Sequence, residues 1–198
     1  MITEGAPMSK PRTSLTHPLR IDTLVDDRTG GTIGITFCPG KQGDSLYGSP
    51  WERDLDMDLD AVKAWGALAL VTLVETHELQ SLGVPGLGVG VRSRGIDWHH
   101  WPIQDLDPPG EEFERLWSVS APSVLGILRS GGKVVVHCRG GVGRAGTVAT
   151  LLAIELGDDP DSALRRVRKA RPGAVETIAQ ERYVRSYRAR LTPPSRGS

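Results

Sequence analysis

Residues 133–147, with the sequence KVVVHCRGGVGRAGT, constrain the fold of this chain more than any other stretch. Residues 133–136 are a short β-branched apolar run, which predicts a buried strand. Several glycines follow within residues 140–146, and the apolar sequence after Arg144 predicts a buried helix. A strand, a glycine-rich loop and a helix in this order indicate an anion site, because the helix N-terminus and the loop both present unpaired N–H groups.

Cys138 opens this loop and Arg144 closes it. The guanidinium of Arg144 can bind two oxygens of a phosphate, and a thiol in such an electropositive environment becomes a thiolate nucleophile. The pattern predicts attack by the sulfur of Cys138 on a bound phosphoryl group. A buried structural cysteine beside a turn is the alternative, but such a turn requires neither the glycines nor the arginine. The loop amides expected to hold the phosphoryl oxygens belong to Arg139, Gly140, Gly141, Val142 and Gly143.

The segment resembles the H-C-x5-R signature of cysteine-dependent protein phosphatases, which here comprises His137, Cys138 and Arg144. The resemblance implies that Cys138 accepts the phosphoryl group, that Arg144 and the loop amides hold its oxygens, and that His137 supports the loop. It also implies a phosphorylated protein as substrate, with a phosphate or similar oxyanion bound in the loop. We expect neither a metal nor another cofactor, because the loop and Arg144 supply the positive charge.

The leaving oxygen of a phosphate ester needs a proton, which a carboxylic acid near the loop can supply. Asp105 and Asp107 are the candidates, and both could equally be ordinary turn residues before proline. The turn FCPG (37–40) and the segment HHWPIQD (99–105) resemble the kinase-associated subfamily of dual-specificity phosphatases. That resemblance favours Asp105 over Asp107, since the subfamily has its acid two residues after Pro-Ile.

Two positions depart from the family pattern. The family usually has Ser or Thr directly after the loop arginine, where the hydroxyl helps the sulfur leave, but this chain has Ala145. Thr147 lies two residues further on and by helix geometry points elsewhere. The late Gln-Thr-x-x-Gln element of tyrosine phosphatases reads Glu176 to Gln180 here, so Gln180 could approach the attacking water, whereas Glu176 is more readily an exposed residue at a helix start.

Three further features can be explained either by a structural role or by a functional one. His99 and His100 are expected to pack under the aspartate loop, since no third ligand at metal spacing accompanies them. Cys38 is expected to be a free structural cysteine, with a reversible disulfide to Cys138 as the alternative. The basic residues within 165–171 are expected to form a solvated helix face, and Arg139 could meet either an acidic substrate or only water.

Strand-like segments at 31–37, 67–75, 96–103 and 133–136 alternate with helical patterns. This alternation predicts an α/β fold with a mainly parallel central sheet flanked by helices, and the resemblance implies a phosphatase-type arrangement. Helices are expected near residues 55–65, 76–82, 111–129, from 144 onward, from Asp159 or Asp161, and over 177–190. We expect a flexible N-terminal arm over 1–20, a single phosphatase domain over 21–191 and a flexible tail over 192–198.

The chain has 198 residues and balances 24 basic against 24 acidic side chains. Its composition gives no indication of a nucleic-acid or membrane partner, and no apolar run approaches the ~20 residues of a membrane span. With two cysteines, one of them needed as a free thiol, we expect a cytoplasmic monomer. The expected activity is hydrolysis of phosphotyrosine, with phosphoserine and phosphothreonine as further substrates. The alternative is a phosphoprotein-binding module with weak or no turnover, which Ala145 would favour.

Overall fold

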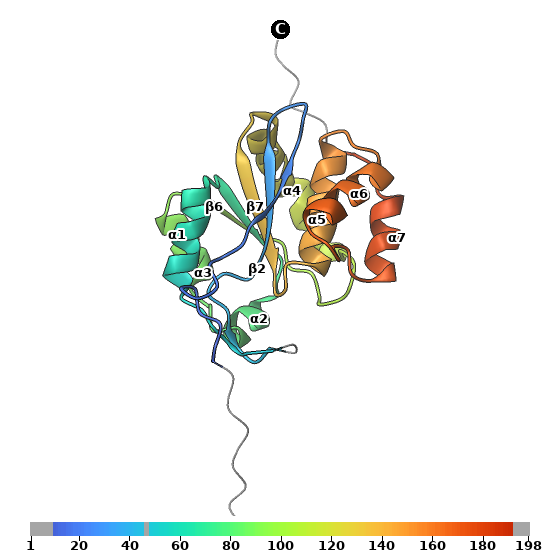
Figure 1. Cartoon of the computed structure of the whole chain (residues 1–198). Coiled ribbons are helices and arrows are strands. Elements are labelled where there is room, and N and C mark those ends of the chain that lie inside the picture. Colours follow the sequence, from blue (N-terminus) through green and yellow to red (C-terminus); the bar gives the residue numbers. More distant parts are fainter. Residues whose placement is uncertain (1–9, 46–47, 192–198) are drawn as a thin grey trace, which may run out of the picture.

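A central sheet lies between two layers of helices in this computed structural model, which describes residues 10–45 and 48–191 (Figure 1). The sheet has five strands in the order β1-β2-β7-β5-β6. Their bounds are Asp22–Val25 (β1), Thr32–Phe37 (β2), Ala69–Thr72 (β5), Asp97–His100 (β6) and Lys133–Cys138 (β7). β1 is antiparallel to β2, and the other pairings are parallel. The prediction of a mainly parallel sheet is therefore confirmed.

β7 occupies the middle of the sheet, and its register determines what lies around the loop that follows it. Val136 pairs with Ile35 of β2 and with Val71 of β5, and all three side chains are fully buried. Buried on both faces, the strand is a continuous apolar run rather than an alternating one. Because β2, β5, β6 and β7 run in the same direction, their carboxyl ends meet at one edge, where ligands bind in sheets of this kind.

Helices cover both faces of the sheet, as Figure 1 shows. Two of them, α1 (Leu55–Trp65) and α3 (Leu87–Ser93), lie on one side, and α2 (Thr76–Ser81) lies at the carboxyl edge. The opposite layer contains α4 (Glu111–Arg129), α5 (Gly143–Glu155), α6 (Pro160–Ala170) and α7 (Ile178–Ser186). Every residue of α5 is buried, because this helix packs between the sheet and the pair α6 and α7. A helix that is buried on all sides requires such a position.

The predicted helices were found close to their expected bounds, and α4 continues through Pro122. The helix predicted over 177–190 is shorter, because α7 ends at Ser186. Glu155 explains the difference, since its buried carboxylate accepts hydrogen bonds from the Tyr187 hydroxyl and from the N–H groups of Arg190 and Leu191. These bonds hold the chain after α7 in an extended course. The sequence analysis also missed β1 and the two-residue strands β3 (Gln42–Gly43) and β4 (Trp51–Glu52), which are too short to show a periodic pattern.

Both predicted terminal segments fall partly or wholly outside the described residues. Residues 1–9 and 192–198 are not described, so the predicted tail cannot be compared with the structure. Within the predicted arm, the backbone N–H of Arg12 donates to the Pro50 carbonyl, and the Ser14 hydroxyl contacts Asp54 at the start of α1. These bonds hold residues 12–14 against the domain. Among the described helices, none combines the length and the apolar character needed to cross a membrane.

A glycine at the start of β2 gives a test of this packing. A Cβ at Gly31 would lie 2.1 Å from the carbonyl oxygen of Leu128, so Gly31→Ala forces the backbone of β2 away from α4. We expect this change to lower the free energy of unfolding by more than about 2 kcal/mol. Gly126→Ala is the matched control, because it lies in α4 with open space around it and should raise stability by about 0.5–1 kcal/mol. Urea denaturation of both variants measures the difference, and equal stability would contradict the packing described here.

Candidate active site

Cys138 is the last residue of β7 and is only 3% exposed. Its Sγ accepts a hydrogen bond from the N–H of Gly141 at 3.2 Å, so the loop folds back over the sulfur. Gly141 has φ of 69°, and a Cβ there would lie 2.5 Å from the carbonyl of Thr36. Only glycine fits this close approach to β2. The tight loop predicted from the glycines is thus explained at this position by a specific contact.

The carbonyl groups of Arg139, Gly140 and Gly141 are held by two cations and, at Arg139, also by the backbone N–H of Cys38 at 3.4 Å. Lys41 Nζ donates to the carbonyl of Arg139 at 3.3 Å. Arg171, at the end of α6, donates to the carbonyls of Gly140 at 3.1 Å and Gly141 at 2.9 Å. In a trans peptide the C=O of one residue and the N–H of the next point in opposite directions. The N–H groups of residues 140–142 therefore point away from these cations, and that of Gly141 reaches the sulfur, as in an anion-binding nest.

Arg144 lies in the first turn of α5 and is 2% exposed. Its two terminal nitrogens donate to both carboxylate oxygens of Glu78 on α2, at 2.5 and 2.9 Å. One of them also donates to the carbonyl of Ile103 at 3.0 Å, and the other lies 2.8 Å from Asp105 Oδ1. The Nε–H of Arg144 is buried and has no hydrogen-bond partner in the described part of the chain. It is the guanidinium donor that the described residues leave unused.

For both Glu78 and Arg144, burial and the ion pair between them shift the pKa in opposite directions. Burial raises the pKa of Glu78, but the hydrogen bonds from Arg144 outweigh it and hold that pKa below its usual range. Burial also lowers the pKa of Arg144, and the hydrogen bond with Glu78 more than restores it. Both side chains are therefore charged at neutral pH. The α5 N-terminus adds to this positive environment, because its N-cap, Val142, provides no side-chain cap.

The segment 103–107 brings the predicted acid to the same point. Asp105 is 54% exposed at its side chain, and its carboxylate contacts Arg144, as given above. Asp107 is also exposed, but its described hydrogen bonds are made by its backbone: the N–H donates to the Gln104 carbonyl at 3.2 Å, and the carbonyl accepts from Gln180 Nε2 at 3.2 Å. The carbonyl of Leu106 accepts from the Thr177 hydroxyl at 3.1 Å, and Leu106 has φ of 66°. The start of α7 thus fixes a strained loop, from which Asp105 contacts Arg144.

His137 supports the loop from within the sheet. Burial lowers its pKa to about 3, so the ring is neutral at physiological pH. Its Nε2 lies 2.8 Å from the hydroxyl of Thr72 on β5, which accepts a hydrogen bond from Trp98 Nε1 at 2.8 Å. The chain of bonds links three strands directly beneath Cys138.

The contacts of Ala145, Thr147 and Gln180 show what each residue does where the sequence departs from the family pattern. Ala145 is fully buried and has no hydroxyl to offer the sulfur. Thr147 donates its hydroxyl to the Gly143 carbonyl at 2.9 Å, as expected from its place on the helix. Gln180 is fully buried, and its amide oxygen accepts from the backbone of Glu176 and Thr177 while its nitrogen donates to Asp107. In this structure Gln180 holds the aspartate loop and the start of α7 together.

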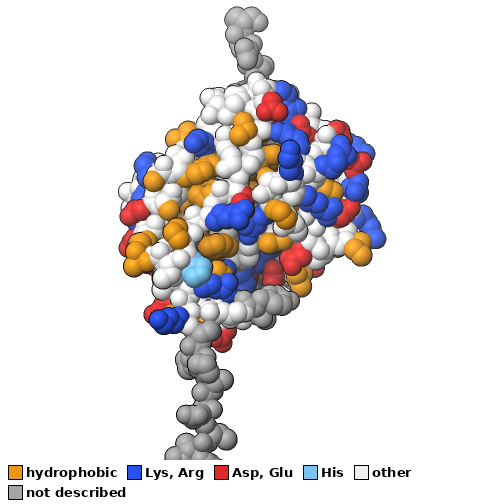
Figure 2. Space-filling model, in the orientation of Figure 1, with side chains coloured by type: hydrophobic (Ala, Val, Ile, Leu, Met, Phe, Trp, Pro, Cys, Tyr) orange, Lys and Arg blue, Asp and Glu red, His pale blue; other side chains and the backbone are white. Residues whose placement is uncertain are grey.

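Three residues of the site were missed by the sequence analysis: Glu78, Lys41 and Arg171. Glu78 was part of a predicted short helix, and nothing in its local sequence indicates that it faces Arg144. Arg171 belongs to the basic run expected to be a solvated face. Figure 2 shows such a face over α6 and α7, where basic and acidic side chains alternate, but Arg171 reaches the loop instead and is also paired with Asp22 on β1. The loop carbonyls and Asp22 explain why this arginine leaves the solvated face.

The remaining candidates lie around the site rather than in it. Cys38 is fully buried and free, and burial raises the pKa of its thiol to about 12, so it stays protonated. His100 contacts the Val74 carbonyl at 2.9 Å and stacks on Trp98, while His99 lies against Trp101. Arg139 is exposed and lines an open groove between α2 and the aspartate loop. Its neighbours in that groove include Glu75, His77, Gln104 and Asp105.

Comparison with known proteins finds relatives over most of the chain. Cyclin-dependent kinase inhibitor 3 of Rattus norvegicus is 30% identical over 179 residues, covering 88% of this chain and 81% of the relative. The Homo sapiens protein of the same name is 31% identical over 184 residues with the same coverage. Protein tyrosine phosphatase type IVA 3 of Homo sapiens is 29% identical and covers 71% of this chain and 75% of the relative.

Solved structures extend the likeness to three dimensions. A crystal structure of kinase associated phosphatase, with its catalytic-site cysteine substituted by serine, has a TM-score of 0.73 at 26% identity and covers 84% of this chain and 92% of that one. The structure of Tk-PTP in its active form has a TM-score of 0.59 at 30% identity, covering 82% and 92%. The family model described as "Swiss Army Knife protein, DSP-PTPase phosphatase domain" matches residues 69–184, the span from β5 to α7 that contains the loop and Asp105. The chain therefore belongs to this family, and it is a protein phosphatase of the tyrosine and dual-specificity type.

Proposed function

We propose that this phosphatase hydrolyses phosphotyrosine in proteins through a phospho-cysteine formed on Cys138, and that phosphoserine and phosphothreonine are further substrates. The observation that carries the proposal is the meeting of three groups at one point. The Gly141 N–H contacts the sulfur of Cys138, Arg144 lies at the start of the next helix, and Asp105 contacts Arg144 at 2.8 Å. A nucleophile, an anion holder and an acid are the groups that phosphoryl transfer to sulfur requires.

In the first step, the thiolate of Cys138 attacks phosphorus and the bond to the leaving oxygen breaks. The N–H groups of residues 140–142 and the guanidinium of Arg144 bind the equatorial oxygens, where charge is greatest in the transition state. Asp105 gives its proton to the leaving phenolic or alcoholic oxygen. In the second step, water attacks the phospho-cysteine, Asp105 takes a proton from that water, and the thiolate and inorganic phosphate leave.

The second step has less support from the loop than the first. The sulfur that leaves must carry a negative charge, and neither Ala145 nor Thr147 offers it a hydroxyl. One missing donor to a developing charge costs on the order of 1–3 kcal/mol. We therefore propose that hydrolysis of the phospho-cysteine limits turnover. If this hydrolysis did not occur at all, the protein would be a phosphoprotein-binding module without turnover. The rate of phospho-cysteine hydrolysis distinguishes the two functions.

The first test uses single substitutions and a phosphotyrosine peptide. Cys138→Ser should abolish phosphate release while binding of the peptide survives. Asp105→Asn should lower kcat by about 10²-fold or more, because the leaving oxygen then departs without a proton. Asp107→Asn is the matched control, since its side chain makes none of the site contacts, and it should keep near-normal activity. Full activity in the Cys138 variant would overturn the covalent route, and a larger effect at Asp107 than at Asp105 would overturn the assignment of the acid.

The second test addresses the release step. We expect rapid mixing with p-nitrophenyl phosphate to give a burst of about one equivalent of p-nitrophenol, followed by slower steady turnover. Ala145→Ser restores a hydroxyl directly after the loop arginine and should raise the steady rate about 5-fold or more, with a smaller burst. Stopped-flow absorbance measures both phases. A linear time course in the unmodified protein would show that the release step is not limiting.

The third test concerns Glu78, which orients Arg144. Glu78→Gln leaves a buried guanidinium without its carboxylate and should lower the free energy of unfolding by on the order of 3 kcal/mol at pH 7. The pKa of Glu78 is lowered in the folded protein, so its stabilising contribution is present above its ordinary value of 4.5 and is lost as the pH falls below it. Urea denaturation at pH 7, 4.5 and 3.5 should therefore show a gap between the two proteins that narrows with acid. A gap that stays constant would contradict the ion pair.

A further inference from the structure

Lys41 is a buried cation directly behind the catalytic loop. It lies in the turn after β2, and only 7% of the residue is exposed. Asp58 of α1 holds this turn, because its carboxylate accepts a hydrogen bond from the N–H of Gly40 at 2.8 Å. β2 is paired with β7 up to Phe37 and Cys138, so a residue just beyond the end of β2 lies close to the start of the loop.

The ammonium of Lys41 has neutral contacts where a carboxylate would be expected. It lies 4.6 Å from the ring centroid of Phe37 and 4.1 Å from that of Trp51, and it donates to the Arg139 carbonyl at 3.3 Å. Asp58 is not its partner, because Arg53 holds both oxygens of that carboxylate at 2.7 and 2.8 Å. Over residues 10–45 and 48–191, Lys41 forms no ion pair. A buried ammonium in this state costs stability.

The charges around Lys41 identify the group that it serves. Burial lowers the pKa of Lys41 to about 8; the thiols of Cys38 and Cys138 favour its charged form, and Arg53 and Arg12 oppose it. Cys38 remains protonated, as its raised pKa shows, so Cys138 is the thiol of the loop whose charged form Lys41 can stabilise. Arg144 and Glu78 neutralise each other in a bidentate pair, and Asp105 contacts Arg144. Two further charged groups lie at the loop: Arg171, which is paired with Asp22, and the exposed Arg139.

We propose that Lys41 is a positioning residue for the reaction: its ammonium stabilises the thiolate of Cys138 from behind the loop, and its hydrogen bond to Arg139 keeps the next amide turned toward the phosphoryl group. The inference rests on the phospho-cysteine mechanism proposed above. Lys41 contacts neither substrate nor attacking water in this scheme. It acts through the sulfur and through the first peptide group of the loop.

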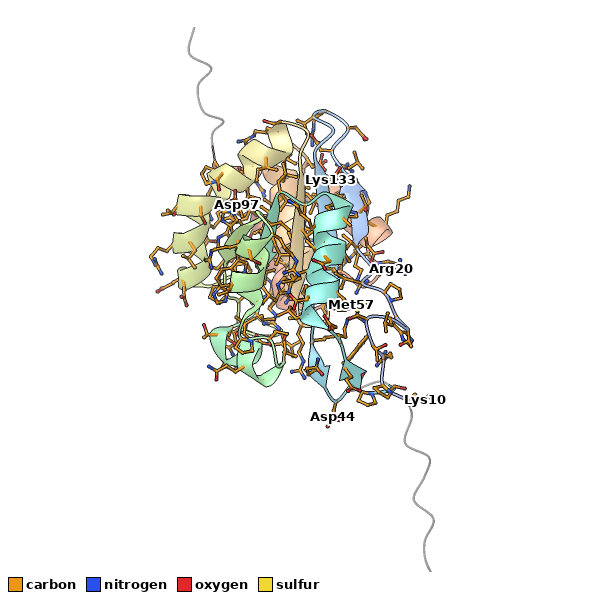
Figure 3. All side chains as sticks on the ribbon, turned by 90° about the vertical axis from the view of Figure 1, so that its left-hand side faces the viewer. Lys10, Arg20, Asp44, Met57, Asp97 and Lys133 are labelled. Atoms are coloured by element: carbon orange, nitrogen blue, oxygen red, sulfur yellow. The ribbon has the colours of Figure 1, made fainter. Side chains whose placement is uncertain are left out.

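The chain offers a matched control at the opposite end of β7. Lys133 Nζ also donates to a backbone carbonyl, that of Trp65, at 3.1 Å, and it lies 5.1 Å over the Trp65 ring. Lys133 begins the strand that Cys138 ends. Figure 3 shows Lys133 at the upper end of the sheet, while Asp44 and the adjoining β3–β4 ribbon lie at the lower end. A lysine with the same kind of contacts is therefore present far from the sulfur.

The test measures the reactivity of Cys138 directly, without turnover. Lys41→Met keeps the aliphatic stem over the rings and removes the charge, Lys41→Arg keeps the charge, and Lys133→Met is the control. Each protein is treated with iodoacetamide between pH 5 and 9.5, and mass spectrometry measures the modified fraction at Cys138. Because a unit change in the pH midpoint is a ten-fold change in thiolate population, we expect Lys41→Met to react about ten-fold more slowly at pH 6. Lys41→Arg and Lys133→Met should react at the rate of the unmodified protein.

Two further measurements separate this role from a purely structural one. The difference in alkylation rate should vanish above about pH 9, because Lys41 has lost its own proton there. The thermal midpoint of Lys41→Met should equal or exceed that of the unmodified protein near pH 7, because a buried charge has been removed. If Lys41→Met does not fold, Lys41→Gln replaces it in every measurement. An unchanged alkylation profile in the folded variant overturns the role proposed for Lys41. Turnover that survives Cys138→Ser overturns the phospho-cysteine mechanism instead, and leaves the effect of Lys41 on the thiol untouched.

Discussion

The orientation of three peptide groups in the loop after β7 is the constraint on which the site depends. Backbone carbonyls that pointed toward the sulfur would repel both the thiolate and a phosphate. Lys41 and Arg171 prevent this by binding the carbonyls of residues 139–141 from outside. Gly141 contributes the left-handed turn and the close contact with β2 that this arrangement requires. The anion site is thus built by cations that never face the anion, and the fully buried helix α5 keeps its own N-terminus fixed beneath the loop.

The guanidinium of Arg144 presents the opposite problem, since it faces the site and is almost fully buried. Glu78 offsets the free-energy cost of burying this charge, and the ion pair fixes the plane of the guanidinium before any substrate binds. A preorganised donor needs no rearrangement during the reaction, which is why such groups favour the transition state. The same fork contacts Asp105, whose loop is held by Thr177 and Gln180 at the start of α7. Asp105 and Arg144, the predicted acid and anion holder, are therefore in contact with each other and are held by separate helices.

The sequence predicted the parts of this site that are local and missed those that depend on tertiary contacts. Strand, loop and helix around Cys138 follow from composition and periodicity within fifteen consecutive residues, 133–147. The prediction of Asp105 depended on the resemblance to a phosphatase subfamily, because nothing in the residues themselves separates it from Asp107. Glu78 and Arg171 could not be found this way, since each acts on a partner far along the chain: Glu78 and Arg144 are 66 positions apart, and Gly141 and Arg171 are 30 positions apart. The early end of α7 has the same origin, because Glu155 captures the chain beyond it.

Ala145 and Lys41 both affect the sulfur of Cys138, Ala145 from the side of α5 and Lys41 from the side of β2. The hydroxyl usual after the loop arginine would donate to the sulfur from the helix, where this chain has a methyl group and Thr147 donates to Gly143 instead. Lys41 approaches from the strand side, behind the carbonyl of Arg139. A positive charge acts on the thiolate both before attack and during release, whereas a single hydrogen bond acts chiefly as the sulfur leaves. The buried ammonium thus favours ionisation of the sulfur and also compensates in part for the missing hydroxyl, which gives a physical reason for retaining a charge that costs the fold stability.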